Sequence, residues 1–181
     1  MEIFGKRYST NELRKRVGSM DQIAGIKVVQ LDDGNERPTR AALFRTGSGL
    51  EFTVLLARGM DISSSSFCGK AMGWRRPTGD VAPQYFEPEG IRWIRSFYGG
   101  LLCTCGLMNV GAPREESALL GTGLHGRISN LPARDVKISQ GWVGNEYVLA
   151  ATGSMRETRV FAENIVLTRS VSTVLGGKRI W

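Results

Sequence analysis

Hydrophobic and polar residues alternate along much of the chain. In residues 50–56, Leu50, Phe52, Val54 and Leu56 occupy every second position, and glycines flank the stretch on both sides. A period of two puts successive side chains on opposite faces of a strand, so this pattern predicts a β-strand. The same pattern predicts strands over residues 27–31, 39–46, 61–67, 136–139, 142–151, 156–161 and 165–174.

The predicted strands follow one another at short spacing, and no segment long enough for a crossover helix separates them. Parallel strands need such crossovers. The pattern therefore predicts a mainly β protein folded as an antiparallel β-sandwich. One short helix is expected over residues 10–17, because Ser9 and Glu12 have the spacing of a capping box and Gly18 follows as a stop. Residues 1–25 comprise this helix and its lead-in.

The last residues have the pattern of an unfinished hairpin. A predicted strand is followed by Gly176-Gly177 and by residues 178–181, which begin a return strand. We therefore interpret residues 1–181 as a single partial domain, the N-terminal part of a larger sandwich. A partial sandwich exposes strand edges, so we expect it to form a homo-oligomer or to associate with the missing C-terminal part.

Residues 70–98 are expected to form a long structured loop, because proline and glycine interrupt every regular pattern there. The stretch is rich in aromatic residues and arginine. A flat ring can receive the apolar face of a sugar while arginine donors bind its hydroxyls or an anionic group. Trp74 and Trp93 are therefore candidate ring platforms. The alternative is that these rings simply pack the loop onto the sandwich.

Composition narrows the class of protein. The chain has 181 residues, of which 41% are hydrophobic and 23% charged, as is typical of a globular domain. No apolar run approaches the ~20 residues that span a membrane, and the first residues lack the apolar region of a secretory signal. We expect a cytoplasmic protein with no membrane partner. The net charge of +7 suits an anionic small molecule. The basic residues are scattered and accompany no nucleic-acid motif, so no nucleic-acid partner is expected.

His125 is the single histidine of the chain and lies in the stretch Gly-Leu-His-Gly-Arg-Ile-Ser-Asn over residues 123–130. Mechanisms that need two histidines are therefore excluded within this chain. The flanking glycines allow a ligand to approach the backbone, and imidazole titrates near neutrality. His125 is thus the first candidate for a ligand-binding residue, with a structural histidine as the alternative. Arg127 is either a ligand contact or a structural partner across the sheet.

Several other candidates have two interpretations. Arg58 and Asp61 lie where a strand ends, and they either bind a ligand or form an ion pair with each other. Asn109 either contacts a ligand or makes a turn. Cys103 and Cys105, with one distant histidine, do not complete a tetrahedral metal site. No glycine-rich loop precedes a helix in the manner of a phosphate site, so neither a metal nor a cofactor is expected.

Three motifs, taken in order, resemble those of a bacterial branch of the aldose 1-epimerase, or galactose mutarotase-like, superfamily. They are Arg-Gly-Met-Asp-Ile at 58–62, the glycine-rich run 93–111, and Leu-His-Gly-Arg-Ile-Ser-Asn at 124–130. The resemblance spans nearly the whole chain and implies the N-terminal part of a large antiparallel sandwich that binds a sugar. Together with the arguments above, it gives the predicted sugar-binding residues His125, Arg127, Arg58, Trp74, Trp93 and Asn109.

The family chemistry needs two groups. A carboxylate removes the anomeric hydroxyl proton and a histidine protonates the ring oxygen, so the sugar opens and recloses as the other anomer. His125 matches an earlier histidine of the family, which holds the sugar. The resemblance therefore implies that the acid histidine and the base glutamate lie beyond Trp181 and that the isolated chain is inactive. The arginine that the family places before its His-Gly step has no counterpart in residues 105–109.

The expected function is carbohydrate binding as part of an aldose 1-epimerase-like protein. A sugar, either neutral or anionic, is the expected small-molecule partner. Two alternatives remain open: a non-catalytic sugar-binding or sensing module, and a basic nucleic-acid-binding β domain. The second predicts affinity that falls steeply with salt.

Overall fold

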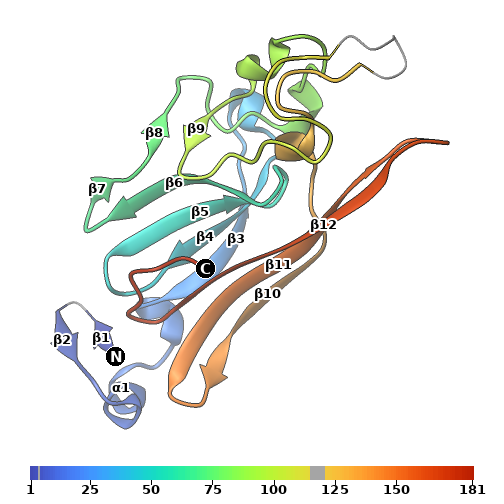
Figure 1. Cartoon of the computed structure of the whole chain (residues 1–181). Coiled ribbons are helices and arrows are strands. Elements are labelled where there is room, and N and C mark those ends of the chain that lie inside the picture. Colours follow the sequence, from blue (N-terminus) through green and yellow to red (C-terminus); the bar gives the residue numbers. More distant parts are fainter. Residues whose placement is uncertain (4, 115–120) are drawn as a thin grey trace.

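Two antiparallel sheets form the framework of the protein, which is described by a computed structural model over residues 1–3, 5–114 and 121–181. The larger sheet has the strand order β3-β4-β5-β6-β7, and the smaller has the order β10-β11-β12 (Figure 1). The strands of the larger sheet are β3 (Gly25–Gln30), β4 (Arg40–Arg45), β5 (Leu50–Leu55), β6 (Asp61–Phe67) and β7 (Lys70–Ala71). Those of the smaller sheet are β10 (Arg134–Val143), β11 (Glu146–Thr158) and β12 (Asn164–Val174).

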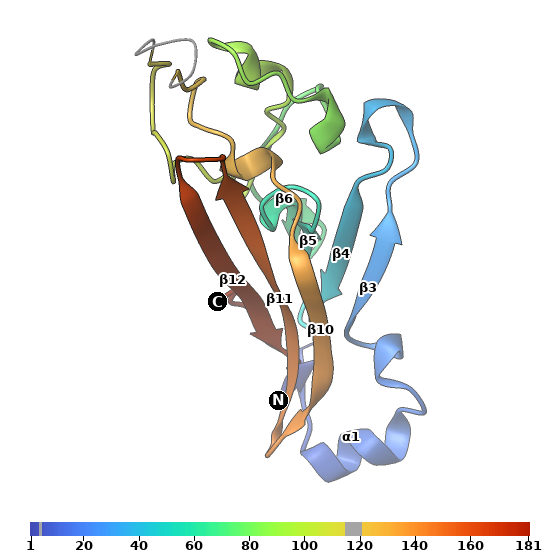
Figure 2. The ribbon, with the colours of Figure 1, turned by 90° about the vertical axis from the view of Figure 1, so that its right-hand side faces the viewer.

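The two sheets face each other, as the side view shows (Figure 2). Buried side chains of both sheets belong to one hydrophobic core. Phe52 and Val54 on β5 belong to the same buried cluster as Leu149 and Met155 on β11. Apolar residues at every second position of both sheets point into this layer, and their removal from water is the main force that holds the sheets together. The predicted antiparallel, mainly β fold is confirmed.

The predicted N-terminal helix is present as α1 (Thr10–Arg16), preceded by the short hairpin of β1 (Glu2–Ile3) and β2 (Lys6–Arg7). Ser9 Oγ accepts the backbone N–H of Glu12 at 3.2 Å, and Glu12 Oε2 accepts the N–H of Ser9 at 2.8 Å. This is the capping box that the sequence predicts. Leu13 is buried against the core. No helix among the described residues is long and apolar enough to cross a membrane.

The hairpin of β10 and β11 differs from the prediction. A single strand was expected over residues 142–151, but Gly144-Asn145 forms a two-residue turn in which Val143 pairs with Glu146. Gly144 has a φ of +59°, the left-handed conformation that such turns require. The strand expected over 156–161 is the end of β11, which runs to Thr158 without a break.

The chain after β12 turns back at residues 175–176, as expected, but forms no assigned strand over residues 178–181. Trp181 nevertheless exchanges two backbone hydrogen bonds with Ser172, at 2.8 and 2.9 Å. The last residues therefore lie along β12 and add one pair of hydrogen bonds to its edge.

Residues 74–114 and 121–130 gather at one end of the sandwich, which we call the loop end (Figure 1). The loop expected over residues 70–98 therefore begins later than expected, because Lys70–Ala71 forms β7 of the larger sheet. Within the loop end, β8 (Trp74–Arg75) pairs with β9 (Gly99–Gly100), and Trp74 lies opposite Gly100. Short 3-10 helices complete the described loops of the chain: Met20–Gln22, Gly34–Glu36, Pro83–Tyr85, Arg92–Arg95 and Ile128–Asn130.

Candidate functional site

Arg58 anchors the loop end from below. Its side chain has no exposed surface. The guanidinium donates from Nε to Ser129 O at 2.5 Å, from Nη1 to Val81 O at 2.6 Å and from Nη2 to Ser96 O at 3.2 Å. Burial lowers the pKa of Arg58, and nearby Tyr98, whose ring centre lies 5.1 Å from the guanidinium carbon, opposes that shift. One side chain thus ties together three segments that are distant in sequence.

The structure agrees with neither of the two roles that the sequence suggests for Arg58, a ligand contact or an ion pair with Asp61. Its donors are engaged by backbone carbonyls, so Arg58 supports the loops and does not face a ligand. It also forms no pair with Asp61, which is fully buried and bonds Arg169 at 2.7 Å instead. The Asp61 carboxylate further accepts the N–H and the hydroxyl of Thr104. The carboxylate at the start of β6 therefore joins the two sheets.

His125 lies in a strained and tightly held piece of backbone. Its φ is +60° and that of Gly126 is +72°, a left-handed pair that is unusual for a residue with a side chain. The His125 N–H donates to Gly111 O, its carbonyl accepts from Gly106 N, and its Nδ1 accepts the N–H of Gly111 at 3.1 Å. Because Nδ1 is an acceptor, the neutral ring carries its proton on Nε2. Nε2 is the ring nitrogen left for a ligand.

His125 lines a pocket of about 450 Å³ that we call the aromatic pocket. Trp93 packs edge-on against His125 with ring centres 4.9 Å apart, and Phe97 stacks on Trp93 at 4.9 Å. Trp93 is 5% exposed and donates its indole N–H to Ser129 Oγ, whereas Trp74 is 59% exposed. The pocket is lined by Trp74, Trp93, Ile94, Phe97, Gly99, Gly100, Cys103, Cys105, Leu124 and His125.

The two cysteines of this pocket are half-buried, and their thiols are unreactive. Burial raises the pKa of Cys103 to about 12, and it also raises the pKa of Cys105. Both thiols are therefore protonated near neutral pH and are poor nucleophiles. Across the described ranges, no group of three or more His, Cys, Asp and Glu side chains could hold a metal ion.

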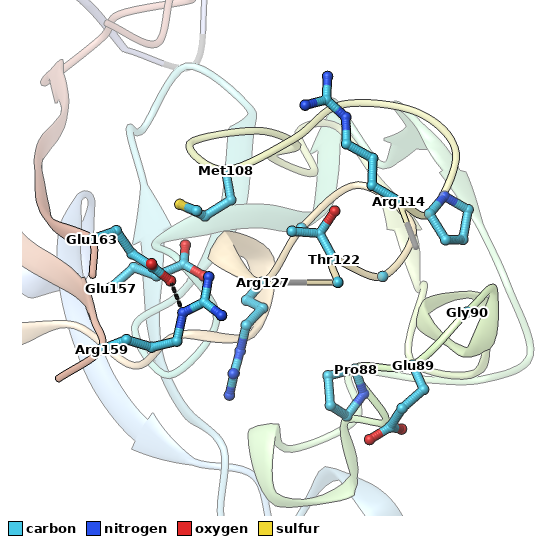
Figure 3. A pocket seen from close by; sticks show the side chains of 14 residues that line it. Pro88, Glu89, Gly90, Met108, Arg114, Thr122, Arg127, Glu157, Arg159 and Glu163 are labelled. Carbon is cyan, nitrogen blue, oxygen red and sulfur yellow. Dashed lines mark hydrogen bonds and ion pairs between the residues drawn. The ribbon is translucent and has the colours of Figure 1, made fainter. Parts of the chain in front are cut away.

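A second pocket, of about 570 Å³, lies on the other side of residues 121–127, and we call it the charged pocket. Glu157, Arg159 and Glu163 gather on its β11–β12 side, facing Pro88 and Glu89, with Arg127 between them (Figure 3). Its lining residues are Pro88, Glu89, Gly90, Met108, Pro113, Arg114, Gly121, Thr122, Gly123, Gly126, Arg127, Glu157, Arg159 and Glu163.

Residues 121–127, which we call the shared segment, contribute to both pockets. Leu124 and His125 line the aromatic pocket, whereas the residues on either side of them line the charged pocket. Gly123 packs directly on the carbonyl of Pro88, where a Cβ would collide with it. Asn109 holds the segment from behind, because its Nδ2 donates to Gly123 O at 3.0 Å. The predicted sugar contact Asn109 is buried, and the alternative, a structural role, fits its bonds.

Several residues of the charged pocket are not singled out by the sequence, and Glu157 is the most deeply buried carboxylate among them. It is 7% exposed at the end of the inward-facing row of β11, after Leu149, Ala151, Gly153 and Met155. Burial raises the pKa of its carboxyl, and the charge of Glu163 adds to this, while Arg127 and Arg159 oppose it. A carboxylate at a position where the period-two pattern calls for an apolar residue is the sequence signal that could have found it.

The structure thus brings Trp74, Trp93 and His125 into one pocket and places Arg127 in the next. Arg127 is exposed, and its guanidinium has no hydrogen-bond partner among the residues that the structure describes. The remaining predicted contacts, Arg58 and Asn109, lie buried behind the pockets.

Comparison with known proteins agrees with this architecture. Residues 36–181 match the family described as a domain of unknown function, DUF4432. The fold resembles a crystal structure described as "a putative aldose 1-epimerase" from Klebsiella pneumoniae subsp. pneumoniae MGH 78578, with a TM-score of 0.75 and 22% sequence identity. The match covers 83% of this chain and 40% of that chain, so this chain spans less than half the length of the Klebsiella protein. No curated protein matches the sequence.

Replacing Arg58 by methionine should lower the free energy of unfolding by about 3 kcal/mol or more. The change leaves three buried carbonyls without donors, and each unsatisfied group costs about 1–3 kcal/mol. Urea unfolding measures the effect, with Arg127→Met as the control, since an exposed arginine should change stability by no more than about 0.5 kcal/mol. An Arg58→Met protein as stable as wild type would contradict the anchoring role.

Replacing Glu157 by glutamine should stabilise the protein increasingly as the pH rises. Burial raises the pKa of Glu157, so the folded state holds its proton more tightly than the unfolded state. The stability that this proton contributes is complete below the unfolded-state pKa and is lost as the pH passes the folded-state pKa. Between pH 4 and pH 8, the free energies of unfolding of Glu157→Gln and of the wild type should therefore diverge, with the variant becoming increasingly the more stable of the two. The control is Glu146→Gln, an exposed position at the other end of β11; parallel curves for Glu157→Gln and wild type would refute the prediction.

Proposed function

Since the chain belongs to the DUF4432 family and has an aldose 1-epimerase-like fold, we propose that it binds a carbohydrate at its loop end. The observation that carries the proposal is the pair of adjoining pockets on either side of the shared segment. One offers aromatic surface and an imidazole, and the other offers charged hydrogen-bonding groups. Sugars present both an apolar ring face and a rim of hydroxyls, so the two pockets match the two kinds of surface on one class of ligand.

In the aromatic pocket, Trp74 provides the ring surface. The Arg76 guanidinium lies 5.4 Å from the centre of the Trp74 ring, and the ring of Phe97 lies 6.2 Å from it at a tilt of 43°. These neighbours restrict the indole, which lowers the entropy lost when a ligand binds. His125 donates from Nε2 to a ring or hydroxyl oxygen of the bound sugar. Trp93 is too buried to act as a platform, and its role is to back His125.

The wider proposal is that these residues hold the sugar for anomer exchange in an aldose 1-epimerase-like protein. That reaction needs an acid and a base placed on opposite sides of the anomeric centre. His125 is the one histidine of the chain, and its Nδ1 is engaged by Gly111. In this proposal His125 is a sugar-holding residue, and other residues of a longer protein supply the acid histidine and the base glutamate. The predicted association with another chain or copy stays a prediction.

Replacing Trp74 by alanine should weaken sugar binding about fivefold or more, because a stacked aromatic contributes roughly 1 kcal/mol or more to such a contact. Titration of the chain with D-galactose and with D-glucose, followed by ligand-observed NMR, measures the dissociation constants. Trp181→Ala is the matched control, because Trp181 is 60% exposed but lies outside both pockets. Wild-type protein that binds neither sugar, nor D-galacturonate, would refute the proposal.

The chain alone should not accelerate the exchange of anomers. Freshly dissolved α-D-glucose should mutarotate at the buffer rate in a polarimeter when the chain is present at micromolar concentration, with a full-length aldose 1-epimerase as positive control. The reason is that one sugar-holding imidazole does not supply both proton transfers. Acceleration that disappears in His125→Asn would instead assign the chemistry to this chain.

A further inference from the structure

The charged pocket contains buried polar atoms that no part of the described chain satisfies. Three buried side-chain atoms among the described residues lack a hydrogen-bond partner: Asn109 Oδ1, Thr122 Oγ1 and Glu157 Oε2. Thr122 and Glu157 both line the charged pocket. Folded proteins satisfy nearly all their buried polar atoms, so these two atoms are open to hydrogen bonds from a molecule that enters the pocket.

Glu157 is fixed in place by the strand that carries it. The backbone of Glu157 pairs with that of Ile165 between β11 and β12, and the Glu157 side chain is more than nine-tenths buried. Thr122 is fixed in a similar way, because its backbone exchanges two hydrogen bonds with Arg114, at 2.9 and 3.0 Å. Both unsatisfied atoms are therefore held on rigid backbone, which is the arrangement that a preformed binding site requires.

The basic and acidic side chains that line this pocket are equal in number. Three arginines, Arg114, Arg127 and Arg159, share its lining with three glutamates, Glu89, Glu157 and Glu163. Arg159 and Glu163 also form an ion pair with each other. A phosphate or carboxylate would meet as many negative as positive side chains here. A hydroxyl group carries no charge and can both donate and accept, so it suits a lining that offers both kinds of group.

We propose that the charged pocket is a subsite for the hydroxyls of an uncharged carbohydrate, in which Glu157 and Thr122 bind neighbouring hydroxyls and Arg127 donates to a third oxygen. This inference rests on the proposed carbohydrate binding and names the ligand chemistry of one of its two pockets. Glu157 binds in either protonation state, because the carboxylate accepts from a hydroxyl and the carboxylic acid donates to one. The groups that face it are Arg127, Arg159 and Glu163.

The test is the affinity for D-galactose of Glu157→Met, which removes both oxygens and nearly keeps the side-chain volume. Its dissociation constant should rise about 10- to 100-fold, as expected for losing a hydrogen bond to an ionisable group. Thr122→Val, which replaces the hydroxyl by a methyl group, should raise it about fivefold. Glu146→Met is the control on the same strand and should leave it unchanged. Glu157→Gln keeps one carbonyl oxygen and should lose less affinity than Glu157→Met.

Three results would overturn the inference. If Trp74→Ala weakens galactose binding while Glu157→Met and Thr122→Val do not, the subsite is refuted and the proposed carbohydrate binding stands. If the wild-type chain binds no sugar, both the subsite and the proposed carbohydrate binding are refuted. If D-galacturonate or inorganic phosphate binds more tightly than galactose, and binds more tightly still to Glu157→Met, the pocket is an anion site. Thermal unfolding of each variant confirms that it is folded before its affinity is compared.

Discussion

The buried guanidinium of Arg58 is the interaction on which the loop end depends. Removing a charge from water is costly, and the cost is offset here because Nε, Nη1 and Nη2 each meet a carbonyl. Those carbonyls belong to Val81, Ser96 and Ser129, in segments that lie outside both sheets. The carbonyls of irregular backbone have no neighbouring strand to donate hydrogen bonds to them. In the loop end the guanidinium of Arg58 donates these hydrogen bonds instead.

The two pockets follow from how the anchored loops meet. Gly123 lies on the carbonyl of Pro88, and a Cβ on Gly126 would come within 2.9 Å of Gly106 O, so the shared segment is pressed between two loops. His125 is left in a left-handed conformation, which costs free energy in any residue with a side chain. The surrounding bonds sustain that strain and fix the orientation of the imidazole. The same packing gives the segment one face toward aromatic rings and one toward charged groups.

The parts of this structure that the sequence predicts are those that local rules determine. The strand at 61–67 and the Ser9–Glu12 capping box depend on period and spacing within a few residues, and both are found as expected. The role of Arg58 depends on carbonyls tens of residues away, and that of Glu157 depends on a pocket whose lining runs from Pro88 to Glu163. Nothing local distinguishes an arginine that binds carbonyls from one that binds a ligand. The break at Gly144-Asn145 is intermediate: its turn signal is local, but apolar residues on both sides obscure it.

The overall charge of the chain and the charge of its pocket are separate properties with separate consequences. The excess of 24 basic over 17 acidic residues gives a net charge of +7, which attracts anions at long range. Part of that excess, Arg14, Lys15 and Arg16, lies on α1 at the opposite end of the sandwich from the loop end (Figure 1). Salt screens interactions between exposed charges that lie more than about 8–10 Å apart, and α1 contributes no residue to the lining of the charged pocket. In the proposed subsite, selection would depend on the lining, where arginines and glutamates are equal in number. A basic protein can therefore hold a site suited to a neutral ligand, because burial makes local groups dominate over distant ones.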